Sequence, residues 1–260
     1  MKYNKFLAFL IMLSFIGCDN SPKIIQKEYK YEKMLFGTHL FSFDFHLENI
    51  ENSSKIYNLI NNLIYDNKNF DEYVEYKERS FVGDIKKEDY PPITNEDRAG
   101  HSHNPPMTTE DGTEYFYNSE FSEKYSIIFK SNTHIIFEYN SNFYNSGAAH
   151  GNYLTKYFVI DLVDEKILDI ADLVSPIPDD LLKEMIASNY NEIHFSRENI
   201  WAPDAINFCN ENIELIWNIY TIAAYSNGMI RIEIQNDIIE PYLTDKGKAL
   251  RNIIAEYNNR

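Results

Sequence analysis

The feature of the sequence that most constrains the fold is an alternation of apolar and polar residues near its C-terminal end. Ile230, Ile232 and Ile234 alternate with two charged residues, directly after the turn sequence Ser226-Asn227-Gly228. Because neighbouring side chains of a strand point to opposite faces, this pattern predicts a strand with one buried and one solvated face. A similar alternation over residues 213–219 precedes the turn, so the two segments together predict an antiparallel hairpin.

Further segments carry the same alternation or a helical spacing of apolar residues. The other strands are expected over residues 40–47, 125–129, 134–139, 153–162 and 167–168. Helices are expected after a cap at Ser53 or Ser54, over residues 70–77, from Asp179 or Asp180, and after a cap at Thr244. This order of strand, helix, meander, helix, hairpin and helix predicts an α+β fold, in which helices pack on a largely antiparallel sheet.

The length of the chain allows either one large domain or two small ones. Its 260 residues are 44% hydrophobic, which is enough to form a buried core without crosslinks. We predict a small N-terminal α/β subdomain over residues 34–122 and a C-terminal domain over residues 123–260. Within the first, residues 83–113 are rich in Pro, Gly, Asp, Glu and Asn and predict a long loop that is either functional or disordered.

The N-terminal residues are typical of an exported lipoprotein. Lys2 and Lys5 precede an apolar stretch over residues 6–16 that is too short to cross a membrane as a helix. At its end, Phe15-Ile16-Gly17-Cys18 resembles the lipobox that lipoprotein signal peptidase reads. The resemblance implies removal of residues 1–17, acylation of Cys18, and a polar tether over residues 18–33 that holds a soluble domain in the cell envelope. Attachment to the inner or to the outer membrane stays open.

The chain is strongly acidic, with 40 acidic and 24 basic residues and a formal net charge of −16. Removal of residues 1–17 takes away two lysines and no acidic residue, so −16 becomes −18. Nucleic acid is therefore not an expected partner, because phosphate binding needs clustered Lys and Arg. The acidic surface could attract a basic protein, or it could serve solubility alone.

The sequence contains two cysteines. Because lipidation would consume Cys18, no disulfide can form within the chain. Cys209 is interpreted as a small packed apolar residue rather than a nucleophile.

The candidate metal ligands are His101 and His103, with which His150 could complete a site. The pair stands in a Pro-rich segment, and no ligand spacing nearby fixes the geometry that zinc requires. We therefore expect neither a metal nor a cofactor.

The candidate catalytic carboxylates are Asp161, Asp169 and Asp172, which lie close together in sequence. Each stands at a strand end or before a short helix, so turn and cap roles are favoured over acid and base catalysis. No serine has the surroundings of a Gly-x-Ser-x-Gly nucleophile. No catalytic residue is assigned, and an enzyme is the less favoured interpretation.

Four stretches together resemble the RsiV-like envelope domains, a catalogued family of unknown function. Residues 147–152 (Gly-Ala-Ala-His-Gly-Asn) are similar to the family's Gly-Gly-Ala-His turn. The other stretches are residues 157–173, 208–212 and 220–234. The resemblance covers residues 140–245 well and residues 35–80 weakly. Ala148 and Asn212 stand where the family often has glycine, and Ala224 stands where proline is common.

The resemblance implies a protein-binding role, because the family includes a lysozyme-sensing anti-sigma factor and an accessory domain of a peptidoglycan deacetylase. It makes Tyr144, Gly147, His150 and Asn152 candidates for ligand binding or for the turn itself. We expect a binding module for an envelope protein, such as a lysozyme, or for peptidoglycan. The alternatives are a part of a peptidoglycan hydrolase and a structural lipoprotein without a specific ligand.

Overall fold

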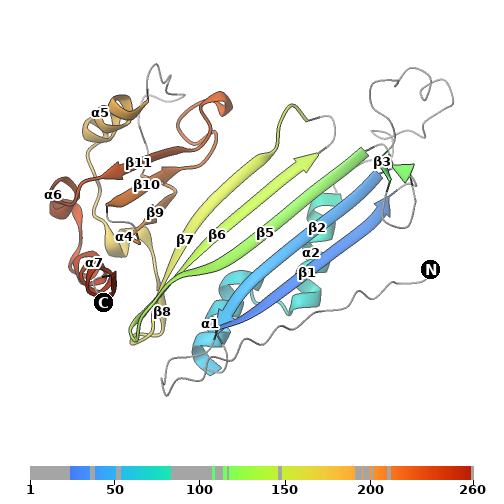
Figure 1. Ribbon diagram of the computed structural model, residues 1–260, viewed down its shortest axis with the longest axis horizontal. Coiled ribbons are helices and arrows are strands. Elements are labelled where there is room, and N and C mark those ends of the chain that lie inside the picture. Colours follow the sequence, from blue (N-terminus) through green and yellow to red (C-terminus); the bar gives the residue numbers. More distant parts are fainter. Residues whose placement is uncertain are drawn as a thin grey trace. The chain divides into compact units, whose positions relative to one another are not determined.

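The computed structural model describes residues 24–35, 39–50, 54–82, 107–108, 114–115, 117–145, 148–190, 195, 200, 202–209 and 212–258 (Figure 1). The strands are β1 (Ile24–Leu35), β2 (His39–Ile50), β3 (Met107–Thr108), β4 (Glu114–Tyr115), β5 (Tyr117–Lys130), β6 (His134–Asn145), β7 (Asn152–Asp161), β8 (Lys166–Leu168), β9 (Ala205–Asn207), β10 (Ile213–Trp217) and β11 (Ile230–Ile234). The helices are α1 (Ser54–Tyr65), α2 (Phe70–Val82), α4 (Ile170–Leu173), α5 (Asp179–Asn189), η2 (Tyr225–Asn227), α6 (Asn236–Ile239), η3 (Glu240–Tyr242) and α7 (Asp245–Asn258). The α+β prediction is confirmed.

The strands form three sheets. The largest has the order β1-β2-β5-β6-β7-β8, the second has the order β11-β10-β9, and β3 pairs with β4. The predicted C-terminal hairpin is present, because β10 pairs antiparallel with β11 and Trp217 lies opposite Ile230. Strands β7 and β8 form a second predicted hairpin, with Val159 opposite Leu168.

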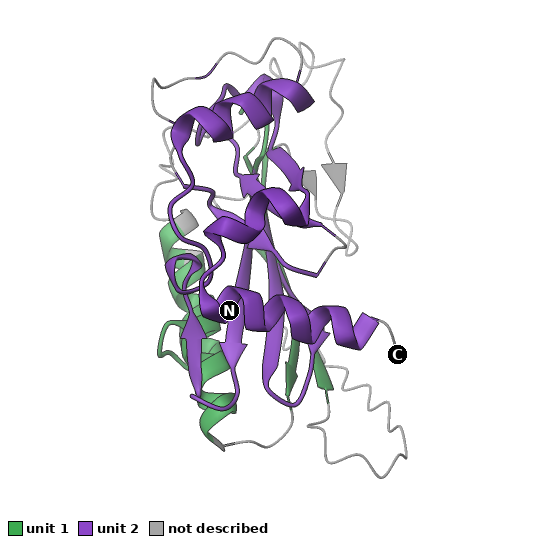
Figure 2. Cartoon of the chain, turned by 90° about the vertical axis from the view of Figure 1, so that its left-hand side faces the viewer, with its two compact units in different colours: residues 1–17, 24–123, 142–152 green, residues 18–23, 124–141, 153–260 purple. Residues whose placement is uncertain are grey.

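The chain divides into two compact units (Figure 2). Among the described residues, unit 1 consists of Ile24–Glu123 and Asn142–Asn152, and unit 2 consists of Lys124–Ser141 and the chain from Tyr153 onward. Both β5 and β6 therefore contribute residues to each unit.

Unit 1 has a core rich in aromatic residues. Its buried rings come from β2, β5 and the two helices: Phe41, Phe43, Phe45, Tyr65, Tyr73 and Phe121. The rings of Phe43 and Phe121 stack with centroids 5.2 Å apart. One charged group is buried with them, because Glu123 on β5 accepts hydrogen bonds from Tyr73 and Lys77 of α2.

The predicted tether over residues 18–33 is wrong from Ile24 onward, because Ile24–Leu35 forms β1. This strand pairs antiparallel with β2 along its whole length, with Tyr29 opposite Phe45 and Tyr31 opposite Phe43. Half-buried Tyr29 and Tyr31 alternate with exposed Glu28, Lys30 and Glu32. The many charged residues hide the period of two, since they occupy the face of the strand that points to solvent.

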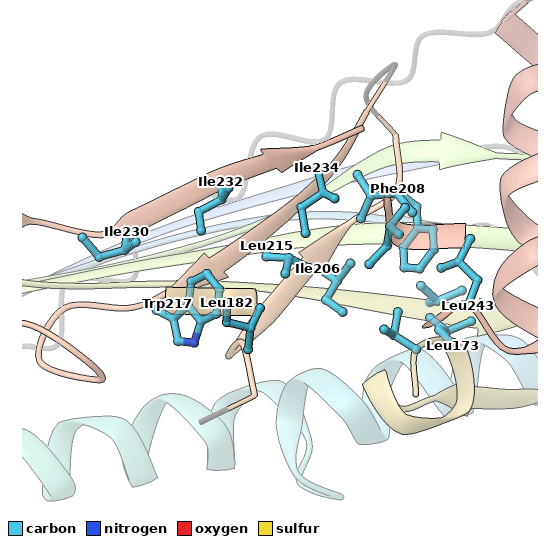
Figure 3. Packing of buried hydrophobic residues seen from close by; sticks show 14 of the residues in the cluster. Leu173, Leu182, Ile206, Phe208, Leu215, Trp217, Ile230, Ile232, Ile234 and Leu243 are labelled. Carbon is cyan, nitrogen blue, oxygen red and sulfur yellow. The ribbon is translucent and has the colours of Figure 1, made fainter. Parts of the chain in front are cut away.

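Unit 2 has an aliphatic core built around β9, β10 and β11 (Figure 3). Both faces of β10 are covered, because Leu215, Ile216 and Trp217 are all fully buried. Helices α5 and α7 add Leu182, Ile186, Leu250 and Ile254 to the same cluster.

Hydrogen bonds at the ends of elements match several sequence predictions. Thr244 caps α7, because its Oγ1 accepts a hydrogen bond from the backbone N of Gly247. Asp172 accepts one from the backbone N of Asp169 ahead of α4, and Asp161 accepts two in the turn after β7. Asp169 stands at the N-cap of α4, so the turn and cap roles predicted for Asp161, Asp169 and Asp172 are confirmed.

Several predictions fall on residues outside the described parts of the chain. They concern the signal peptide, Cys18, Ser53, Gly147, the histidines His101 and His103, and most of the loop over residues 83–113. None of the helices among the described residues is both long enough and apolar enough to span a membrane.

Candidate functional site

The candidate residues from the family resemblance lie at the turn between β6 and β7. Tyr144 is half-buried near the end of β6, and Asn152 is exposed at the first position of β7. His150 is half-buried and its Nδ1 donates a hydrogen bond of 3.3 Å to the carbonyl oxygen of Gly151. That bond joins His150 to the backbone of the turn, and whether the side chain also meets a ligand stays a prediction.

Cys209 has the properties of a packed residue. It contacts the core cluster of unit 2, and burial raises the pKa of its thiol to about 12, although Arg251 opposes the shift. A thiol with such a pKa stays protonated at neutral pH, and the thiol is a far weaker nucleophile than the thiolate.

The structure draws attention instead to three tyrosines of unit 2, which we call the tyrosine patch: Tyr153, Tyr220 and Tyr225. Tyr153 is 45% exposed and Tyr220 is 51% exposed, so both side chains are accessible to a partner. The rings of Tyr220 and Tyr225 lie with centroids 5.7 Å apart. Loss of solvent raises the pKa of Tyr225, and the proximity of Tyr153 and Tyr220 raises it further. The three phenols are therefore neighbours.

The patch is assembled from two strand ends and a short helix. Tyr153 is the second residue of β7, Tyr220 follows β10, and Tyr225 begins η2. After η2, Gly228 has a φ of 69° and its N–H donates a hydrogen bond of 2.8 Å to Tyr225. Glycine adopts this conformation without a steric penalty, so it ends η2 and lets the chain enter β11.

Ala224, which stands where the RsiV-like domains commonly have proline, has a backbone conformation that proline could also adopt. Ala224 has a φ of −65°, which is the angle that a proline ring imposes. The approach to Tyr225 therefore has the geometry that proline would give.

Asn218 joins β7 to the end of β10 beneath the patch. Its side-chain oxygen accepts a hydrogen bond of 2.8 Å from the backbone N of Thr155, and its side-chain nitrogen donates one of 3.1 Å to the backbone oxygen of the same residue. Both residues are buried. This two-way bond fixes the strand that carries Tyr153 relative to the turn that carries Tyr220.

A half-buried polar cluster lies on the same strands. Arg231 of β11 approaches Glu214 of β10 at 3.4 Å, and Tyr157 of β7 donates a hydrogen bond of 2.9 Å to Glu138 of β6. Burial raises the pKa of Tyr157, and Glu138 raises it further because the carboxylate accepts its proton in the hydrogen bond. Both carboxylates thus have protein partners, and the cluster fixes the strands that present the patch.

The described residues contain no group of three or more His, Cys, Asp or Glu side chains able to hold an ion. The pair His101 and His103 stands outside them.

None of the three tyrosines of the patch is among the residues that the sequence predicted for ligand binding. A signal was present for two of them, because Tyr220 and Tyr225 stand in the stretch over residues 220–234 that resembles the RsiV-like domains. What the sequence could not provide was their exposure, since tyrosines near alternating strands more often belong to a core or a sheet face.

No model of a known protein family matches the sequence, and no curated protein matches it either. The structure is similar to that of a DUF3298 family member from Bacteroides fragilis, with a TM-score of 0.63 and 18% sequence identity. The alignment covers 92% of this chain and 98% of that one. The chain has the fold of a DUF3298 protein.

A second DUF3298 protein, from Pseudomonas aeruginosa, aligns over 88% of this chain and 97% of its own with a TM-score of 0.47 and 13% identity. The two structures differ too much for residues to be compared between them. The name DUF3298 denotes a domain of unknown function, so the likeness gives the fold and no activity.

Proposed function

We propose that this chain is a lipid-anchored binding module of the bacterial envelope, related to the RsiV-like domains, which captures a basic envelope protein through its tyrosine patch. The single observation that carries the proposal is the grouping of three partly or largely exposed tyrosines at a strand end, a turn and a short helix of unit 2. Tyrosine is enriched at protein interfaces and among the residues that dominate binding energy.

The physical basis is the amphipathic nature of the tyrosine ring. Each ring offers a large apolar face and one hydroxyl group, and only two side-chain torsions must be fixed on binding. Because the patch is supported by buried Asn218 and Thr155, the backbone that carries two of its rings is already ordered before a ligand arrives. Such preorganisation lowers the entropic cost of association.

The charge of the chain defines the class of partner. A net charge of −16, or −18 after removal of residues 1–17, favours encounter with a basic protein, and the faces of tyrosine rings attract Lys and Arg side chains. A lysozyme combines a basic surface with a location in the envelope, and it is the ligand that the family resemblance implies.

The lipid anchor has its own test. Cys18→Ala in the full chain should leave the precursor unprocessed or release the protein from the membrane fraction, because acylation needs the thiol. Membrane fractionation with metabolic labelling by a palmitate analogue measures both effects. An unchanged lipid-labelled band in the variant would remove the anchor from the proposal.

Binding is tested by titrating the purified full chain with a hen-type lysozyme and, separately, with peptidoglycan. Saturable, salt-sensitive binding of lysozyme is expected, and Tyr220→Ala or Tyr225→Ala should weaken it at least tenfold, the effect of about 1.4 kcal/mol. Tyr76→Ala and Tyr257→Ala are matched controls, because these tyrosines are 50% and 54% exposed and stand on α2 and α7.

Equal affinities of the patch variants and the controls would contradict the patch as the binding surface. Binding of peptidoglycan alone, or turnover of wall fragments, would replace the proposed partner by the wall or by an activity on it.

A further inference from the structure

Tyr220 has a backbone conformation that its side chain disfavours. It is the third residue of a four-residue turn closed by a hydrogen bond of 3.1 Å from Thr221 N to Asn218 O, and its φ is 66°. A positive φ at this position is typical of type II turns, where glycine or asparagine usually stands. Tyr220 is 51% exposed, so burial in the core does not account for a tyrosine at this position.

One carboxylate, that of Asp204, stabilises the turn in this strained conformation. Oδ2 of Asp204 accepts a hydrogen bond of 2.7 Å from the backbone N of Asn218 and another of 2.7 Å from Oγ1 of Thr221. These two donors stand at the first and last residues of the turn, on either side of Tyr220. Hydrogen bonds to a charged acceptor are stronger than neutral ones, so one group fixes both ends.

Asp204 is itself well anchored. Its backbone N donates a hydrogen bond of 2.9 Å to Ile216 O, and it stands between the buried residues Pro203 and Ala205 at the start of β9. The position of its carboxylate is therefore set by the core of unit 2. Strain in the backbone persists only where the surrounding structure imposes it, and it is often found at ligand sites.

We infer that Asp204 is a positioning residue of the tyrosine patch, which keeps Tyr220 in its left-handed conformation and so directs the ring toward the partner. The inference rests on the proposed function for its ligand, but not for its backbone mechanism. Removal of the carboxylate should let the turn relax, and the ring of Tyr220 should then leave its place beside Tyr225.

The binding arm uses the full chain and the same hen-type lysozyme. Asp204→Ala is expected to weaken binding about tenfold or more, whereas Asp204→Asn should retain most of the affinity, because the amide oxygen can accept both hydrogen bonds. Asp237→Ala is the matched control, since it removes an equal charge from an exposed site of the same unit.

The second arm needs no ligand and measures melting temperatures. Tyr220→Gly in the native background should raise the melting temperature by a few degrees, because glycine adopts a positive φ without strain. In the Asp204→Ala background the same change should give little increase, since the turn has already relaxed. A residue that only stabilised the fold would give additive effects.

The outcomes separate the two proposals. If Tyr220→Ala and Tyr225→Ala lose affinity while Asp204→Ala keeps it, the positioning role is overturned and the patch remains. If the tyrosine variants bind normally, the proposed function fails, and the melting cycle alone decides whether Asp204 holds the strained turn. Additive melting shifts would overturn that role in either case.

Discussion

In unit 1, Tyr65 and Tyr73 of the helices are buried, whereas in unit 2 tyrosines of strand ends and turns reach the surface. Tyr65 and Tyr73 are each 3% exposed and pack against Phe45, while Tyr153 and Tyr220 are about half exposed. The helices α1 and α2 have apolar faces to bury, and the turn that carries Tyr220 has none. A tyrosine is thus buried or exposed according to its position on the element that carries it, since Tyr76 of α2 is 50% exposed whereas Tyr73 of the same helix is buried.

The two cores differ in a similar way. Unit 2 buries mainly aliphatic residues and Trp217 around β10, whereas unit 1 combines aromatic rings with the buried carboxylate of Glu123. Lys77 lies 2.8 Å from that carboxylate and about 5 Å from the centroids of the Tyr73 and Phe121 rings. The aromatic core of unit 1 therefore contains an ion pair whose carboxylate is buried, whereas the core cluster of unit 2 consists of apolar residues.

The largest effect is expected from Trp217→Ala in unit 2. Its indole is fully buried, so the substitution removes a large apolar surface and leaves a cavity, at a cost of about 3–5 kcal/mol in the free energy of unfolding. Urea denaturation measures the loss. Val163→Ala, at a residue that is 70% exposed, is the control and should change stability by less than about 0.5 kcal/mol. Equal effects would show that packing does not dominate unit 2.

A smaller effect is expected from Glu123→Ala in unit 1. The ammonium group of Lys77, whose side chain is 19% exposed, would lose its partner, and we expect a loss of about 2–3 kcal/mol because the group keeps some access to water. The same urea titration measures it.

The double variant Lys77→Met with Glu123→Leu sharpens the comparison. Apolar residues of similar size need no ion pair, so the double variant should be more stable than Glu123→Ala. If the double variant were less stable than Glu123→Ala, the ion pair would contribute more to the free energy of unfolding than apolar side chains of similar size.

The smallest effect concerns pH and His39 of unit 1. This histidine is buried, its Nε2 lies 2.8 Å from Oγ of Ser119, and burial lowers its pKa below 6.5. Its neutral form is therefore favoured in the folded state. The contribution of His39 to the free energy of unfolding should be fully present above its pKa in the unfolded chain, about 6.5. It should be lost as the pH drops below that value toward the pKa of the folded state.

Unfolding titrations at a series of pH values between 7 and 5 check this expectation. His39→Asn should make the decline shallower. His134→Asn in unit 2 should do so to a smaller degree, because Asp161 partly opposes the lowering of the pKa of His134 by burial. An unchanged slope in His39→Asn would contradict the role of this histidine in unit 1.

Elements with a clear period were predictable from the sequence. The alternation at Ile230, Ile232 and Ile234 gives β11, and the apolar spacing after residue 53 gives α1. Strand β1 was missed because Lys and Glu fill its exposed face, and an edge strand with half-buried Tyr29 and Tyr31 looks polar in sequence. Helix α2 was expected to end near Lys77 but continues to Val82.

The candidate site was only partly predictable. The sequence predicted candidate residues around His150, which are not those of the patch, whereas Tyr220 and Tyr225 only fell within a stretch that resembles the RsiV-like domains. The positive φ of Tyr220 and the two hydrogen bonds of Asp204 were not predictable, since they join residues 14 and 17 positions apart through the tertiary fold. A glycine or asparagine in the sequence predicts a turn with a positive φ, whereas a tyrosine does not.

The most direct test of the tyrosine patch is photocrosslinking of the full chain to a hen-type lysozyme, with p-benzoylphenylalanine at position 220, 76 or 257. Mass spectrometry then identifies the positions that form an adduct with lysozyme. We predict adducts from position 220 and none from positions 76 and 257. Adducts from position 76 or 257, with none from position 220, would contradict the claim that the patch is the binding surface.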